Sequence, residues 1–105
     1  MYSSVYGDSG KDKIIGVKSH DVLDGGMDDD LIRGLKGIDL IYGAEGSDKI
    51  SGGAGDDLID GGSDDDILNG GTDNDILNGG SGRDTAQFSA LNNKITLLTT
   101  ITKDR

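Results

Sequence analysis

The stretch GGAGDDLIDGGSDDDILNGGTDNDILNGG at residues 52–80 decides how this chain folds. It repeats every nine residues, with a glycine first, an aspartate sixth and an apolar residue eighth in each unit. Followed outward, the same period divides residues 7–87 without a gap into nine nonapeptides. These are GDSGKDKII, GVKSHDVLD, GGMDDDLIR, GLKGIDLIY, GAEGSDKIS, GGAGDDLID, GGSDDDILN, GGTDNDILN and GGSGRDTAQ. A period of this kind predicts a repeat architecture.

Three positions of the nonapeptide hold throughout residues 7–87. Glycine occupies the first position and aspartate the sixth in all nine units. The aspartates are Asp12, Asp21, Asp30, Asp39, Asp48, Asp57, Asp66, Asp75 and Asp84. The eighth position is apolar in every unit, as Ile14, Leu23, Ile32, Ile41, Ile50, Ile59, Leu68, Leu77 and Ala86. Because positions two to five are mostly small or polar, we expect six residues of turn and then three of strand in each unit.

These units exclude a helix and favour a coil of short strands. Glycine at this density costs roughly 1 kcal/mol per residue relative to alanine in a helix. A coil with two units, or 18 residues, per turn stacks the strands into two facing parallel sheets with the eighth-position residues between them. We therefore predict an all-β solenoid over residues 7–87, with residues 1–6 as a lead-in or first rung. Residues 88–105 are expected to cap the other end with one longer strand in KITLLTTIT.

The composition indicates that something outside the chain must stabilise it. Only 32% of the 105 residues are hydrophobic, and the formal net charge is −10. Such a composition also fits a disordered acidic linker, but the strict phase of Gly, Asp and Ile or Leu argues against that interpretation. One apolar side chain per nonapeptide buries too little surface to order the backbone, so we expect the ion-free coil to be marginal or unfolded.

The composition and the motifs of the sequence disfavour several classes of partner and of function. Cysteine is absent, which excludes disulfides and thiolate metal sites. The negative charge disfavours nucleic acid, no apolar run is long enough to span a membrane, and the N-terminus lacks the pattern of a secretory signal peptide. His20 falls in a variable turn position, and no candidate base, nucleophile or zinc motif is present, so we expect no enzymatic activity. Cations remain the natural partner.

The aspartates are expected to form two ladders, one along each edge of the coil. Asp12, Asp30, Asp48, Asp66 and Asp84 belong to one edge, and Asp21, Asp39, Asp57 and Asp75 to the other. Carboxylates stacked about 4.8 Å apart repel one another unless a cation lies between them. Calcium, with Ca–O distances of about 2.3 to 2.6 Å, suits this spacing if turn carbonyls supply the remaining ligands. Neighbouring pairs allow four sites on the first edge and three on the second, a maximum of seven.

The units resemble the G-G-x-G-x-D-x-U-x nonapeptides of RTX proteins, the haemolysin-type calcium-binding repeats. The resemblance implies a right-handed parallel β-roll with calcium in the turns, and a secreted bacterial protein of the kind exported by type I secretion. It implies that one ion uses Gly53, Gly55 and Asp57 with Gly70, Thr72 and Asp75. A second ion uses Gly62, Asp64 and Asp66 with Gly79, Ser81 and Asp84. The further candidate ligand positions are Gly43, Glu45, Gly46, Gly52, Ala54, Gly61, Ser63, Gly71 and Asp73.

The first two units depart most from the family pattern. GDSGKD and GVKSHD lack the second glycine, as do GLKGID and GAEGSD, and Ser19 replaces the glycine at position four of the second unit. A non-glycine residue adopts a positive φ angle less readily. We therefore expect the sites that involve the first two units to be the weakest.

The seventh positions, which face outward, differ between the two sheets. In the even-numbered units they are Val22, Leu40, Leu58 and Ile76, whereas the odd-numbered units carry Lys13, Leu31, Lys49, Ile67 and Thr85. The apolar column is either ordinary β-propensity on a solvated face or a docking surface for an attached domain or a second copy. Lys13, Lys49 and Arg33 on one sheet, and Tyr42 on the other, leave open a module that binds an alginate-like polysaccharide.

The main prediction from the sequence is a calcium-binding module that folds when it meets calcium outside the cell. It would stabilise an attached domain or assist its secretion, because a chain that stays unfolded at low internal calcium is compatible with export.

Overall fold

The computed structural model describes residues 2–87, 94–97 and 101–104, and these form an all-β chain of twelve strands. The strands are β1 (Tyr2–Tyr6), β2 (Lys13–Ile15), β3 (His20–Asp24), β4 (Leu31–Arg33), β5 (Leu40–Tyr42), β6 (Lys49–Ser51), β7 (Leu58–Asp60), β8 (Ile67–Asn69), β9 (Asn74–Asn78), β10 (Asp84–Gln87), β11 (Lys94–Leu97) and β12 (Ile101–Asp104). Most of them occupy the last three positions of a nonapeptide, as the turn-then-strand pattern predicts.

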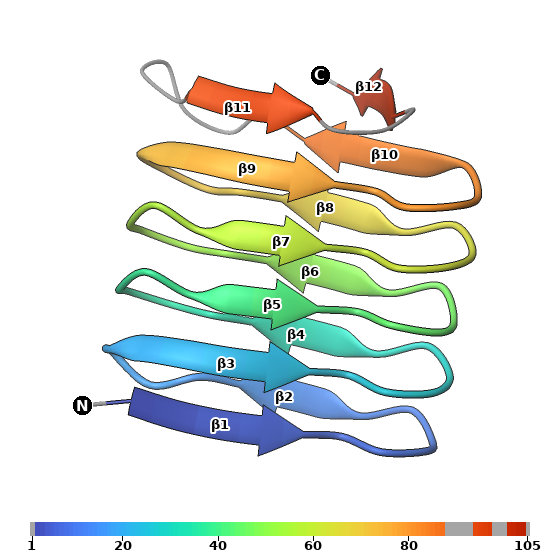
Figure 1. Cartoon of the computed structure of the whole chain (residues 1–105), viewed down its shortest axis with the longest axis horizontal. Helices are drawn as coiled ribbons and strands as arrows, with labels where there is room; N and C mark the ends of the chain where they lie inside the picture. The colour runs from blue at the N-terminus through green and yellow to red at the C-terminus, as the bar shows by residue number, and fades with distance from the viewer. Residues whose placement is uncertain (1, 88–93, 98–100, 105) are drawn as a thin grey trace.

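Successive strands alternate between two parallel sheets, so the chain winds as a solenoid (Figure 1). The front sheet has the order β1-β3-β5-β7-β9-β11, and the rear sheet has the order β12-β10-β8-β6-β4-β2. Within the repeats every pair is parallel and in register with a residue 18 positions away, as in Leu40 with Leu58 and Leu58 with Ile76. The prediction of two facing parallel sheets with two nonapeptides per turn is confirmed.

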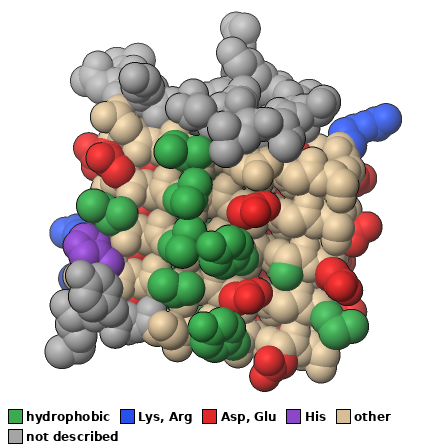
Figure 2. All heavy atoms as spheres, in the orientation of Figure 1, with side chains coloured by type: hydrophobic (Ala, Val, Ile, Leu, Met, Phe, Trp, Pro, Cys, Tyr) green, Lys and Arg blue, Asp and Glu red, His purple; other side chains and the backbone are tan. Residues whose placement is uncertain are grey.

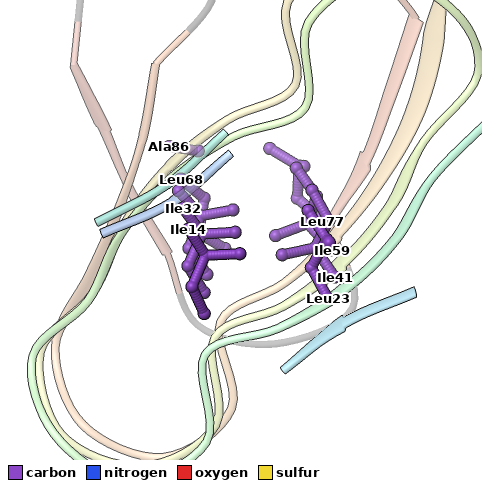
Figure 3. Close-up of a cluster of buried hydrophobic side chains, with 9 residues drawn as sticks. Ile14, Leu23, Ile32, Ile41, Ile59, Leu68, Leu77 and Ala86 are labelled. Atoms are coloured by element: carbon purple, nitrogen blue, oxygen red, sulfur yellow. The ribbon is translucent and has the colours of Figure 1, made fainter. Parts of the chain in front are cut away.

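The core is a single layer formed by the eighth-position side chains. Ile14 is 5% exposed, and the other eight, from Leu23 to Ala86, are at most 1% exposed. Two rows of these side chains, one from each sheet, face each other across the interior (Figure 3). Val5 of β1 packs against this layer at one end. The core is therefore continuous along the solenoid, but between the two sheets it consists only of these two facing rows of side chains.

The C-terminal region differs from the single longer strand expected in KITLLTTIT. Two strands are present, β11 beside β9 in the front sheet and β12 beside β10 in the rear sheet. Their registers, Lys94 with Asn74 and Ile101 with Asp84, depart from the spacing of 18. The physical reason is that the roll ends in two open sheet edges, and a single strand could pair with only one of them.

Glycine at the second position of a unit allows the turns to stack closely. Gly62 has φ +88°, and a Cβ there would overlap the carbonyl oxygen of Ala44 in the preceding turn of the same edge. Gly10 has a similar φ of +94°, but a Cβ there would meet nothing within 4 Å. A substitution at Gly10 would therefore cause backbone strain alone, whereas a substitution at Gly62 would cause backbone strain and a steric clash with the neighbouring turn.

We expect Gly62→Ala to lower the free energy of unfolding more than Gly10→Ala does. Both variants place an L-residue in the left-handed region at a cost of about 1 to 2 kcal/mol, and only Gly62→Ala also forces two turns apart. Urea unfolding in saturating calcium measures both. Equal losses in the two variants would contradict the close stacking of the turns.

Candidate metal centre

The sixth-position aspartates form two ladders along the edges, each joined by hydrogen bonds from backbone to side chain. The backbone N–H of Asp57 donates to Oδ1 of Asp75 at 2.9 Å, and that of Asp66 donates to Oδ1 of Asp84 at 2.9 Å. The same bond, at 2.8 to 2.9 Å, joins Asp12 to Asp30, Asp21 to Asp39, Asp30 to Asp48, Asp39 to Asp57 and Asp48 to Asp66. Each ladder therefore has a direction, with the amide of one turn held by the carboxylate of the next.

The second oxygen of each of these carboxylates has no hydrogen-bond partner. The side chains from Asp21 to Asp84 in the ladders are at most 3% exposed. Their unpaired atoms are Oδ1 of Asp21 and Oδ2 of Asp12, Asp30, Asp39, Asp48, Asp57, Asp66, Asp75 and Asp84. Leaving an ionised oxygen buried and unpaired is costly. A row of such atoms therefore fits a bound cation.

The first-position glycine provides the space beside the unpaired oxygen. A Cβ on Gly61 would lie 2.6 Å from Oδ2 of Asp66 and 3.0 Å from the carbonyl oxygen of Gly79. The same close approach recurs at Gly43, where a Cβ would lie 2.6 Å from Oδ2 of Asp48. The invariant glycine is thus explained by the carboxylate that it faces, since any larger residue would occupy the place of that oxygen.

Burial raises the pKa of the ladder carboxyl groups. Loss of hydration is the largest cause, the backbone N–H bond opposes it, and neighbouring aspartates reinforce it. The pKa of Asp57 and of Asp66 is raised to about 8. The pKa of Asp48 is raised to about 7, those of Asp39 and Asp75 to about 6, and those of Asp30 and Asp84 are also raised. The carboxylate form is therefore destabilised most at Asp57 and Asp66, where a cation would relieve the greatest cost.

Side chains alone do not complete a metal site. Among the described residues, no group of three or more His, Cys, Asp or Glu side chains is placed to hold a metal ion. The remaining oxygen ligands of a cation bound at a ladder would be backbone carbonyls or water. The carbonyl oxygens of Gly53 and Gly62 accept one N–H each from the next turn, at 3.2 Å from Thr72 and 3.0 Å from Ser81. Each of these oxygens keeps a second lone pair for an ion.

The structure brings the predicted ligand groups together in adjacent turns of the same edge. Gly53, Gly55 and Asp57 lie beside the turn that contains Gly70, Thr72 and Asp75, as the bonds from Thr72 N–H to Gly53 and from Asp57 N–H to Asp75 show. The other predicted group is likewise joined by the bonds from Ser81 to Gly62 and from Asp66 to Asp84. Glu45 has an exposed side chain, which leaves its backbone as the part that faces the turn below.

Aspartate or asparagine side chains at three further positions accept backbone N–H groups, a role that the repeat pattern did not reveal. Those at positions four and five join adjacent turns, and those at position nine act locally. At position four, Asp28, Asp64 and Asp73 accept the N–H of the glycine one turn earlier, at 2.8 to 3.0 Å. At position five, Asp29, Asp56 and Asp65 accept an N–H from the next turn, at 2.7 to 2.9 Å. At position nine, Asp24, Asp60, Asn69 and Asn78 accept the N–H two residues on. This last pattern is the Asx-turn, which an Asx before a glycine pair signals in sequence.

A parallel β-solenoid with rows of buried, unpaired carboxylate oxygens along both edges defines a class of cation-binding repeat proteins. Among known families, the model described as RTX calcium-binding nonapeptide repeat (4 copies) matches residues 6–41, 24–59, 33–68, 42–77 and 51–86. These matches extend together from residue 6 to residue 86, so the chain belongs to the RTX calcium-binding nonapeptide repeat family. No curated protein and no solved structure matches the chain. Within the described residues, no helix is long and apolar enough to cross a membrane.

The raised pKa values predict that acid stabilises the ion-free roll. Asp57 and Asp66 titrate near 8 in the fold but near 4 in an unfolded chain, so the fold binds more protons between these values. The free energy of unfolding without calcium should therefore fall as pH rises from about 4 to about 8. Circular dichroism of the metal-free chain at pH 5 and pH 8 measures this, and more β structure at pH 8 would contradict it. With saturating calcium the trend should vanish, since the ions replace the protons.

Proposed function

We propose that this chain is a calcium-driven folding module of a secreted bacterial protein, in which it stabilises an attached domain and assists its export. The observation that carries the proposal is the row of buried carboxylate oxygens without partners along each edge. Family membership supports calcium as the ion. The turn carbonyls and the sixth-position aspartates would hold it, and the ion would supply the positive charge that the interior lacks.

The charge of the chain makes such folding conditional on calcium. The net charge is −10, and seven divalent ions would add +14, so a fully loaded roll would carry about +4. Each interior aspartate is shared by the turns above and below it, so each ion faces little carboxylate charge. We expect dissociation constants in the weak extracellular class of about 10⁻⁴ to 10⁻³ M. The chain would then stay unfolded at the low calcium of a cell interior and fold outside.

Calcium titration followed by circular dichroism tests the proposal. The wild-type chain should be largely unstructured in chelator at neutral pH and gain β structure with calcium, whereas magnesium should fail because it demands a tighter octahedral geometry. A full β spectrum in chelator at neutral pH would refute folding driven by calcium.

Substitution of adjacent aspartates sharpens this test. Asp57→Asn should move the calcium midpoint upward by about tenfold or more, given about 1.5 to 3 kcal/mol for a bond to a charged group. Asp56→Asn is the matched control, because Asp56 is exposed and its bond to the Asn74 N–H can be kept by asparagine. Equal midpoints for the two variants would remove the sixth-position aspartate from the site.

The alternative function, binding of an alginate-like polysaccharide, has weaker support. Arg33 and Lys49 do line a shallow groove of about 300 Å³ on the rear sheet, together with Ser51, Asn69 and Gln87. No aromatic residue is among the lining residues, and Tyr42 belongs to the front sheet. The groove thus offers charge without a ring on which a sugar could stack.

The front sheet carries a surface that supports docking. Val22, Leu40, Leu58 and Ile76 line a groove of about 420 Å³ (Figure 2). We propose that a second calcium-loaded copy occupies it. The column repeats every 18 residues, so two copies related by a two-fold axis can interdigitate. Bound calcium would lower the magnitude of the net charge of each copy and so weaken the repulsion between them.

Sedimentation velocity in saturating calcium tests this docking. The wild-type chain should associate, and Leu40→Lys combined with Leu58→Lys should abolish the association. Leu31→Lys combined with Ile67→Lys is the matched control, because Leu31 and Ile67 hold the same seventh position on the rear sheet and are 36% and 37% exposed. A monomeric wild type, or equal loss in both variants, would overturn the docking proposal.

A further inference from the structure

The second turn of the roll, residues 16–21, has a different backbone from the other eight. In every other turn the residues at positions two and four both have positive φ, between +68° and +107°. In the second turn these positions are Val17 and Ser19, and neither has a positive φ. Valine is branched at Cβ and strongly avoids the left-handed region. The turn therefore lacks the conformation that the rest of the roll uses to arrange its carbonyl groups.

The carboxylate of Asp21 is also used differently. Its Oδ2 accepts the backbone N–H of Val17 at 3.0 Å, within the same turn. Oδ2 is the unpaired atom in the other eight sixth-position aspartates. Asp21 therefore closes its own turn through the oxygen that faces Gly16, the position where the other turns keep a free oxygen beside their first-position glycine.

The residue before the turn offers the Val17 N–H no side-chain acceptor. In four turns the second-position N–H is accepted by an Asx side chain two residues earlier, as Gly62 donates to Asp60 and Gly71 to Asn69. The corresponding residue before Val17 is Ile15, which has no acceptor. Arg33 and Tyr42 also lack an Asx acceptor before their turns, but the residues that follow at position two, Leu35 and Ala44, have positive φ. Val17 combines a neighbour without an acceptor with a φ that is not positive, and its N–H is satisfied by the carboxylate inside the turn.

We infer that the turn of residues 16–21 does not bind calcium and is instead closed by the hydrogen bond from Val17 to Asp21. This inference rests on the proposed calcium-dependent function. Oδ1 of Asp21 and Oδ2 of Asp39 are both unpaired, but residues 16–21 offer no carbonyls arranged by positive φ, and a calcium site needs 6 to 8 oxygen ligands. The pair Asp21 and Asp39 is then removed from the predicted set. The maximum falls from seven sites to six, with four on the first edge and two on the second.

Calcium counting by equilibrium dialysis tests the inference, with circular dichroism as an independent readout. The wild-type chain should bind no more than six ions. Asp21→Asn should leave both the ion count and the calcium midpoint within about twofold of wild type, because the asparagine oxygen can still accept the Val17 N–H. Asp57→Asn, on the same edge, should lose bound calcium and raise the midpoint.

The possible outcomes distinguish a failure of this inference from a failure of the proposed calcium-dependent function. A count of seven ions, or loss of an ion from Asp21→Asn, overturns the inference and leaves the proposed function intact. No effect of either aspartate variant on calcium binding overturns the proposed function itself.

A gain of binding provides the reverse test. Val17→Gly combined with Ser19→Gly should restore positive φ at both positions, release Oδ2 of Asp21 and add one bound ion. Adding Asp21→Asn to this double variant should remove that ion again. An unchanged ion count in the double variant would show that the backbone of this turn is not what excludes calcium, and would overturn the inference.

Discussion

The fold depends on one interaction, the hydrogen bond from the backbone N–H of a sixth-position aspartate to the carboxylate of the aspartate one turn later. It holds consecutive turns together along both edges, at 2.8 to 2.9 Å. It also takes only one oxygen of each carboxylate and buries the other without a partner. The bond that stacks the turns therefore creates the electrostatic cost that a cation would relieve. The stacking of the turns and the unpaired buried oxygens therefore arise from the same side chain.

The narrow core follows from the same constraint. Each nonapeptide uses its sixth residue for the ladder and its first glycine for the space beside it, which leaves the eighth residue to fill the interior. A larger core would need longer strands, and longer strands would separate the two ladders from the core that they flank. The chain thus has little hydrophobic stabilisation to set against the ordering of its backbone. Stability must come from the edges.

The nonapeptide period was sufficient to predict the two sheets, the pairing of Leu40 with Leu58 and the ladder that includes Asp57 and Asp75, because each depends only on phase. Contacts that depend on rotamer or backbone angle could not be predicted in this way. Which oxygen of Asp75 holds the amide, and the bond from Val17 to Asp21, depend on local backbone angles and side-chain rotamers that the period does not specify. The two strands β11 and β12 follow the last nonapeptide, so the period of the repeat could not predict them.

The pKa values along the ladders indicate why the turns should act together. On the second edge the pKa of Asp57 is raised to about 8, and the charges of Asp39 and Asp75 are among the causes, whereas the pKa values of Asp39 and Asp75 are raised to about 6. Each added turn removes water from the carboxylates of its neighbours and brings another negative charge close to them. A roll formed without cations would therefore bring these carboxylates together at an electrostatic cost, which bound cations would offset. Coupling between nearest neighbours is general in solenoids, and in this chain the stacked carboxylates contribute an electrostatic part to it.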